Sequence, residues 1–267
     1  MKSNNIYIKR LHSLNSPGLK SWAIKRIAVL LFCILLNSGC EKAAICDCFK
    51  GTGDEITETR TASPFNVVDL NNKVDLHVHR DSVYRITVTS GKKLINNITT
   101  TIEGGILKID NENKCNWVRD FQNKFSVHIY VPSIQQLEVN ESSGNIYFED
   151  TMISQNFLFE SWGSTGDYHL KLNCHTITMA LQTGPASLYA EGDVGVAYLW
   201  NSGGGRFDAL KLKTDDIYAT NIGMNDVLLY PEIKLEGVIE FSGNIYYKGS
   251  PSIQQFQDNG SGEFIQL

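Results

Sequence analysis

Apolar and polar residues alternate along the chain from Thr57 onward, and no segment there has the 3.6-residue apolar period of an amphipathic helix. Alternation with a period of two places successive side chains on opposite faces, so it predicts half-buried strands. The clearest apolar sets are Val74, Leu76 and Val78; Tyr84, Ile86 and Val88; and Phe125, Val127, Ile129 and Val131. The body of the chain is therefore predicted to be all-β.

The second half of the chain adds a repeat of turn-like glycines at Gly144, Gly166, Gly184, Gly204, Gly223, Gly243 and Gly262. The steps between them are 22, 18, 20, 19, 20 and 19 residues, which falls among the periods of solenoid proteins. The tetrapeptide Gly-Asn-Ile-Tyr begins at Gly144 and again at Gly243. Hairpins of an antiparallel sandwich would recur every 8 to 12 residues or so. We therefore predict a right-handed parallel β-helix with rungs of about 20 residues.

The first 40 residues follow a different pattern. Six basic and no acidic side chains accompany an apolar stretch over residues 27–36, which ends before Asn37-Ser38-Gly39-Cys40. A bilayer-spanning helix needs about 20 apolar residues, so this short stretch predicts an export signal. The remaining residues, 41–267, hold 18 basic and 29 acidic side chains, a net charge of −11. This acidity argues against nucleic acid or an anionic membrane surface as a partner of the body.

Ser38 and Gly39 before Cys40 resemble the lipobox of bacterial lipoproteins, in which the cysteine is diacylated and becomes the new N-terminus. Asn37 departs from that pattern, which prefers an aliphatic residue there. We expect residues 1–39 to be a signal peptide, Cys40 to carry the lipid, and residues 40–56 to form a tether. The lipid is then the expected contact with the membrane.

Four cysteines remain after the signal peptide and Cys40 are set aside: Cys46, Cys48, Cys115 and Cys174. Export would place them in an oxidising compartment, where disulfides form. Four thiols allow three pairings, and the sequence does not choose between them.

Several short motifs follow one another in a set order: Gly51-Thr52-Gly53, Phe65-Asn66-Val67-Val68, Glu103-Gly104-Gly105-Ile106, Ser143-Gly144-Asn145-Ile146 and Ser242-Gly243-Asn244-Ile245. In this order they resemble the head GIN domain family of bacterial auto-transporter adhesins, over residues 51–267. The resemblance implies a head GIN-like β-helical domain at residues 57–267. It also implies anchoring in the envelope of a Gram-negative bacterium, at the outer membrane, with no catalytic residues to carry over and no cofactor.

Candidate catalytic and metal-binding residues are few. A β-helical polysaccharide lyase or hydrolase needs carboxylates at one position of adjacent rungs. Here Asp167, Asp208 and Asp226 lie 1, 4 and 3 residues after their rung glycines, so they are out of phase. His77 and His79 share a strand face, but no third potential ligand lies at a spacing typical of metal sites. We predict no metal site and no enzyme, with a carbohydrate-active β-helix enzyme as the alternative.

Two aromatic residues are the candidates for ligand binding. Trp162 and Trp200 each lie four residues before a rung glycine. Exposed aromatic rings bind sugar rings or protein partners, so the pair predicts a glycan- or protein-binding face. The alternative is that both fill corners of the core.

The last rung offers an apolar edge formed by Phe264, Ile265 and Leu267. An open solenoid end needs a cap or a partner, so the sequence allows either a capped monomer or an oligomer formed through the end rungs. The sequence as a whole predicts a non-catalytic binding, adhesion or scaffolding module. A structural or signalling envelope component that assembles through its end rungs is the other alternative.

Overall fold

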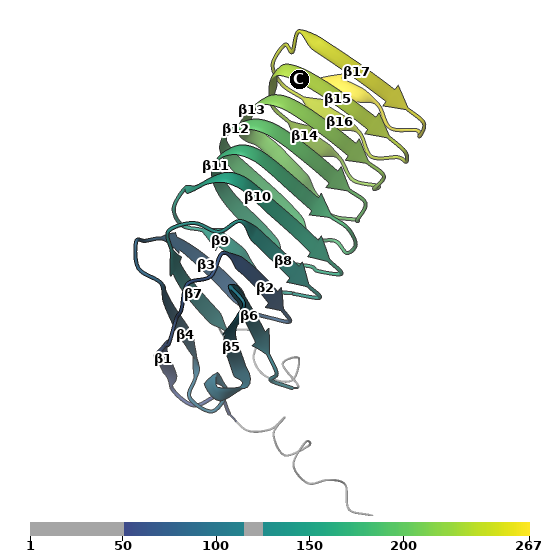
Figure 1. Cartoon of the computed structure of the whole chain (residues 1–267). Coiled ribbons are helices and arrows are strands. Elements are labelled where there is room, and N and C mark those ends of the chain that lie inside the picture. Colours follow the sequence, from purple (N-terminus) through teal and green to yellow (C-terminus); the bar gives the residue numbers. More distant parts are fainter. Residues whose placement is uncertain (1–50, 115–124) are drawn as a thin grey trace, which may run out of the picture. The chain divides into compact units, whose positions relative to one another are not determined.

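The computed structural model describes residues 51–114 and 125–267 (Figure 1). Within these residues the only helical element is the 3-10 turn η1 (Ile95–Asn97), so no described helix is long enough to cross a membrane. The expected signal peptide, Cys40, Cys46, Cys48 and Cys115 lie outside the described residues. The rest of the regular structure is β, as predicted.

The N-terminal part of the described chain mixes antiparallel and parallel pairs. Its strands are β1 (Glu55–Arg60), β2 (Val67–Asn71), β3 (Asp75–Arg80), β4 (Arg85–Gly91), β5 (Ile98–Glu103), β6 (Ile106–Asn111) and β7 (Ser126–Val131). β4 pairs antiparallel with β1 and β7, and β5 pairs antiparallel with β6. Gly104 and Gly105 have φ of +58° and +82°, which lets the β5–β6 hairpin turn tightly. The sequence pattern did not predict these antiparallel pairs.

The remainder of the described chain forms a solenoid of parallel strands. Its strands are β8 (Gln136–Asn140), β9 (Ile146–Phe148), β10 (Met152–Trp162), β11 (Asp167–Leu181), β12 (Ser187–Asn201), β13 (Phe207–Asn221), β14 (Val227–Leu229), β15 (Pro231–Ile239), β16 (Ile245–Tyr247), β17 (Ile253–Asp258) and β18 (Phe264–Gln266). Leu172 pairs with Gly192, which pairs with Leu212, so these rungs add 20 residues each; the step is 22 residues from Gln136 to Leu158 and 18 from Val227 to Ile245. This confirms a β-solenoid of about seven turns with the predicted period.

Each rung has two sides that continue the strands of the N-terminal part. The Trp side consists of β6, β2, β8, the C-terminal halves of β10 to β13, β15 and β17. The His side consists of β7, β3, β9, the N-terminal halves of β11 to β13, β14, β16 and β18. Residues at the same position in successive rungs form a column.

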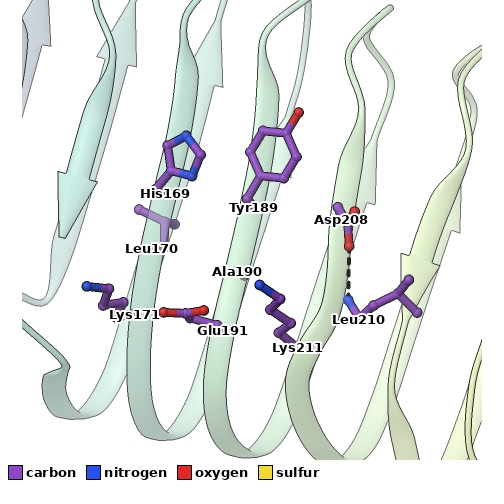
Figure 2. Close-up of a pocket in the computed structure, with 9 residues that line it drawn as sticks. All are labelled: His169, Leu170, Lys171, Tyr189, Ala190, Glu191, Asp208, Leu210 and Lys211. Carbon is purple, nitrogen blue, oxygen red and sulfur yellow. Dashed lines mark hydrogen bonds between the residues drawn. The ribbon is translucent and has the colours of Figure 1, made fainter. Parts of the chain in front are cut away.

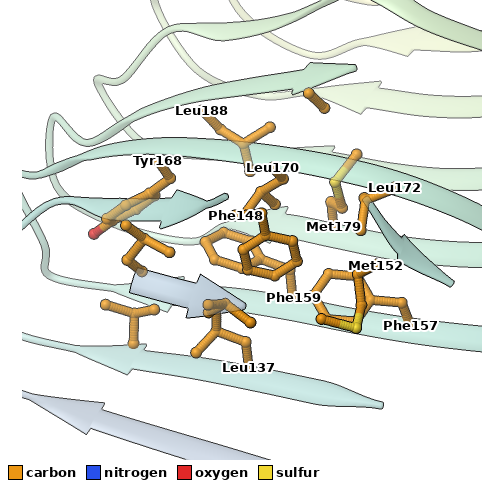
Figure 3. Close-up of a cluster of buried hydrophobic side chains, with 14 of the residues drawn as sticks. Leu137, Phe148, Met152, Phe157, Phe159, Tyr168, Leu170, Leu172, Met179 and Leu188 are labelled. Atoms are coloured by element: carbon orange, nitrogen blue, oxygen red, sulfur yellow. The ribbon is translucent and has the colours of Figure 1, made fainter. Parts of the chain in front are cut away.

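The core lies between the two sides, where alternate side chains of each strand point inward (Figure 3). Phe148 meets Phe157 edge-on at 5.8 Å between ring centroids, and Phe159 meets Tyr168 at 5.5 Å. Such tilted ring pairs add about 0.5–1.5 kcal/mol each to the burial of their apolar area. The inward alternation confirms the half-buried strands predicted from the sequence.

The predicted rung glycines all lie in the loops that lead from the Trp side to the His side. A Cβ at Gly144 would lie 1.9 Å from the Val74 carbonyl oxygen, so the loop stacks there too closely for any side chain. Gly204 is the exception, because nothing lies within 4 Å of a Cβ at that position. Its neighbour Gly205 is the crowded residue, with a Cβ only 1.7 Å from the Ala186 oxygen.

An asparagine ladder fills the inside of the same corner. Asn201 and Asn221 are 1% and 0% exposed, and Asn201 Nδ2 donates to Asn221 Oδ1 at 3.1 Å. Asn221 Oδ1 also accepts from the Gly223 amide, and its Nδ2 donates to the Asn225 carbonyl. These bonds satisfy backbone groups of the turn that would otherwise be buried without partners.

Cys174 is buried in the core, and no disulfide joins it to another of the described residues. Burial raises the pKa of this thiol, which lowers the fraction of reactive thiolate. Cys174 thus behaves as a small apolar core residue in the structure.

Candidate binding surface

An aromatic patch lies on the Trp side, over β12 and β13. The rings of Tyr198 and Tyr218 stack at 5.1 Å between centroids with planes 14° apart. Trp200 is 40% exposed beside them and lines the same hollow of about 280 Å³. The Lys234 ammonium lies 4.4 Å from the centre of the Tyr218 ring. Exposed rings of this kind offer apolar contact area with little loss of conformational freedom on binding.

Trp162 lies on the same side but in another column. Trp200 pairs with Ala180, which pairs with Glu160, whereas Trp162 pairs with Asn140. Both tryptophans precede a rung glycine by four residues, but this equal spacing does not place them in one column. The reason is that Gly205, and not Gly204, is the residue that packs closely against the preceding rung. Trp162 is 43% exposed, so the alternative that the two tryptophans fill corners of the core is wrong.

Trp162 lines a polar pocket of about 390 Å³ at the edge of the Trp side, where the strands turn into the corner loops. We call it the corner pocket, and its lining residues are Asn71, Asn72, Asp110, Asn140, Glu141, Trp162, Gly163 and Thr183. Asn72 Nδ2 donates to Asp110 Oδ1 at 2.6 Å. The Glu141 carboxylate has no hydrogen-bond or ion-pair partner among the described residues.

Two residues of the corner pocket have a left-handed backbone, a conformation that asparagine tolerates and that strains glutamate. Among the described residues, Asn72 and Glu141 are the only non-glycine residues with positive φ, at 61° and 50°. Gly163, in the next rung, has the same conformation with φ of 62°. A left-handed residue with a Cβ costs roughly 1–2 kcal/mol, and such outliers concentrate at functional sites.

A second surface lies on the His side, where five outward rings form one continuous stack across five strands. In order, the stack contains His128, His77, Tyr147, His169 and Tyr189. Successive centroids are 4.3, 5.0, 5.5 and 5.0 Å apart. The strand spacing of about 4.8 Å sets this repeat, since each ring belongs to the next strand of one column.

The histidine end of the stack is partly desolvated. Burial, followed by the nearby charges of His77 and His79, lowers the pKa of His128 to about 4. Burial also lowers the pKa of His79, whose Nε2 lies 3.0 Å from His128 Nδ1. The hydrogen bond from His77 Nδ1 to Glu149, at 2.6 Å, lowers the pKa of that carboxyl. These three histidines come from two neighbouring parallel strands, β3 and β7.

The histidine cluster does not present a metal site. In the described part of the chain, no group of three or more His, Cys, Asp or Glu side chains has a geometry that would hold a metal ion. His77 uses its Nδ1 for Glu149, and one nitrogen of the His79–His128 pair donates to the other.

The other end of the stack opens into a groove of about 410 Å³ (Figure 2). There the column continues from Tyr189 to Asp208, so a carboxylate follows the last ring. A second column, Lys171, Glu191 and Lys211, forms the opposite wall with charges that alternate in sign. The Asp208 carboxylate is already held by the Leu210 amide and by Arg206, at 3.2 and 2.8 Å.

Sequence reasoning did not identify Asn72, Asp110 and Glu141 as site residues. Their proximity depends on pairing between strands that are far apart in the chain, with Asn71 opposite Asn140. One sequence signal was available, because Asp69-Leu70-Asn71-Asn72 and Glu138-Val139-Asn140-Glu141 share an acid, an aliphatic residue and an asparagine in the same order. Aligning these two segments would have placed Asn72 beside Glu141.

Comparison with known proteins shows which family the chain belongs to. The family model described as "Putative auto-transporter adhesin, head GIN domain" matches residues 64–251 of the 267-residue chain. The chain belongs to the head GIN domain family. This confirms the family resemblance seen in the sequence, and no curated protein matches the chain.

Three solved structures share the head GIN domain fold. A crystal structure titled a putative adhesin, from Bacteroides fragilis NCTC 9343, has a TM-score of 0.73 at 17% identity, covering 80% of this chain and 97% of its own. From Parabacteroides distasonis ATCC 8503, a structure titled a putative adhesin has a TM-score of 0.62 at 16% identity, covering 81% and 98%. Another structure from that strain, titled a putative lipid binding protein, has a TM-score of 0.60 at 17% identity, covering 80% of this chain and 98% of its own. At these identities the likeness shows the fold.

Proposed function

We propose that this head GIN domain protein is exported, anchored by a lipid on Cys40 in the outer membrane of a Gram-negative cell, and acts as a non-catalytic adhesin. The observation that carries the proposal is the exposure of aromatic rings on the Trp side, with Trp200 and Tyr198 beside each other and 40% and 47% exposed. Large exposed apolar side chains that cluster on a soluble domain mark interaction surfaces. The names of relatives as adhesins agree with this proposal.

The rigidity of the solenoid supports binding rather than turnover. Strands hydrogen-bonded on both edges hold the rings of the Trp side at fixed spacing, so a ligand meets a preformed surface. In the proposal, the ligand is a glycan or a protein of the envelope or of a host surface. Neither nucleic acid nor a cofactor takes part, and assembly through the end rungs would increase the number of sites presented.

Metabolic labelling tests the anchor. Cells expressing the full chain are grown with labelled palmitate, and the Cys40→Ala variant serves as the control. We expect label on the wild-type protein and its recovery in the outer-membrane fraction, with both lost in the variant. Protease treatment of intact cells then distinguishes display on the surface, where the body is digested, from the periplasmic side, where it is protected.

A double variant tests the binding surface. Trp162→Ala and Trp200→Ala together should weaken adhesion of expressing cells to glycan- or protein-coated surfaces at least tenfold, because both indoles lie on the exposed Trp side. A double variant that folds as the wild type does and adheres equally well would contradict the proposed role of this side.

A further inference from the structure

We infer that the corner pocket is a binding site for the pyranose ring of a neutral sugar, with Trp162 as the stacking platform and Asp110, Asn140 and Glu141 as hydrogen-bond acceptors. The inference rests on the proposed binding function and deepens it. It assigns sugar recognition to the corner pocket and not to the patch around Trp200.

The shape and apolar wall of the corner pocket suit one sugar ring. Its volume of about 390 Å³ lies in the usual range for small-molecule sites, about 300–1,000 Å³. No other aromatic ring in the described part of the chain stacks on Trp162, which is 43% exposed. A pyranose has one face of C–H groups and a rim of hydroxyls, so its apolar face matches the indole.

The polar wall has an excess of acceptors. Asp110 Oδ1 accepts from Asn72 Nδ2 and from the Asn111 amide, both at 2.6 Å, which leaves Oδ2 open. Asn140 donates its Nδ2 to Asp69 at 3.3 Å and keeps its Oδ1 open. The Glu141 carboxylate is open as well. Sugar hydroxyls are donors that satisfy such acceptors, and charged acceptors give the stronger bonds.

Charge excludes acidic sugars from this site. The lining includes two carboxylates, from Asp110 and Glu141, and no Lys, Arg or His. An anionic uronic acid or a phosphorylated sugar would be repelled there, because like charges at close range repel each other. The charge of the lining therefore rules out an acidic sugar and is compatible with the neutral pyranose of the inference.

Backbone strain shows that the Glu141 side chain is kept at a cost. Gly163 in the adjacent rung adopts the same left-handed conformation without a Cβ, so glycine would suit position 141 as well. A Cβ at Gly163 would lie 3.6 Å from Glu141 Cγ, which places the Glu141 side chain directly over the next rung. A role of the carboxylate in binding explains why a strained glutamate occupies this position.

The experiment uses the full chain in detergent, with EDTA present, against immobilised neutral oligosaccharides of glucose, galactose, mannose and N-acetylglucosamine. Polygalacturonate serves as the anionic probe. We expect at least one neutral oligosaccharide to bind the wild type, and Trp162→Ala and Glu141→Gly each to weaken that binding at least tenfold. Phe241→Ala, which removes a ring that is 53% exposed and lies outside the corner pocket and the patch around Trp200, should leave it within twofold. The Tm of Glu141→Gly should equal or exceed that of the wild type.

Retained binding in both pocket variants would overturn the inference, as would binding of polygalacturonate alone or binding that requires added Ca²⁺. Adhesion of cells without binding of any neutral saccharide would also overturn it, while leaving the proposed adhesin function intact. If wild-type cells do not adhere and the wild-type protein binds no saccharide, the proposed function itself is contradicted.

Discussion

Single glycines in the corner loops decide whether the rungs can stack at the spacing of hydrogen-bonded strands. At most of the loop glycines, the backbone packs against a carbonyl oxygen of the preceding rung, so closely that an added Cβ would clash with that oxygen. The triplet Gly203-Gly204-Gly205 contains both kinds of position. Gly205 is pressed against the Ala186 carbonyl, whereas Gly204 faces open space and has a backbone conformation that any residue adopts.

The triplet gives a matched pair of substitutions. We expect Gly205→Ala to lower the free energy of unfolding by about 3 kcal/mol or more, because the added methyl group forces two backbone segments apart. Gly204→Ala should be neutral or stabilising by up to about 1 kcal/mol, since alanine restricts the unfolded chain. Urea unfolding of the two variants and the wild type measures both effects. Equal stability of the two variants would show that the close approach does not limit stacking.

Strand pairing at the element scale brings together side chains that share no local motif. β3 and β7 lie parallel with His77 opposite His128, and β9 adds Tyr147 on the other side of β3. Neither strand alone shows more than alternate polar positions. The parallel register converts these positions into a ring stack in which His128 is held neutral by partial burial and by its histidine neighbours.

This cluster makes stability depend on pH. The pKa of His128 falls from 6.5 when exposed to about 4 in the fold, so between these values the unfolded chain binds a proton that the folded chain does not. Stability therefore decreases as the pH falls from about 6.5 to 4. The pKa of Glu149 is lowered by its hydrogen bond with His77, so protonation of this carboxyl at lower pH reduces the stability of the fold further. Urea unfolding at several pH values should show a shallower slope for His128→Gln than for the wild type, and equal slopes would contradict the assignment.

The described part of the molecule has unlike ends. At the N-terminal end, Leu94, Ile95 and Ile98 are no more than 3% exposed, so η1 and β5 cover the first rung. At the other end every residue of β17 is exposed, and Phe256 and Leu267 are 40% and 62% exposed. Repeat proteins rely on nearest-neighbour contacts, so a rung with one neighbour is less stable than a rung with two.

Amide hydrogen exchange should follow this difference. We expect the slowest exchange in β11, β12 and β13, whose strands pair on both edges, and the fastest in β17, which pairs only with β15. Mass spectrometry of peptic fragments resolves these regions. Protection of β17 that increases with protein concentration would indicate that the last rung, with Phe264 stacked on Phe256 at 4.3 Å, contacts a second copy.

Local patterns in the sequence determined the strands, the period of about 20 residues and the glycine corners, because each depends on neighbours along one rung. The same patterns left the hand of the coil, the lipid on Cys40 and the ligand as predictions. Tertiary structure decided which rung positions meet: it separated Trp162 from Trp200, placed Asn72 beside Glu141, and ended the ring stack at Tyr189. Register between rungs depends on the lengths of the corner loops and on bulges such as those at Tyr189/Glu191 and Thr214/Asp216, and a shift of one residue moves every side chain to the other face.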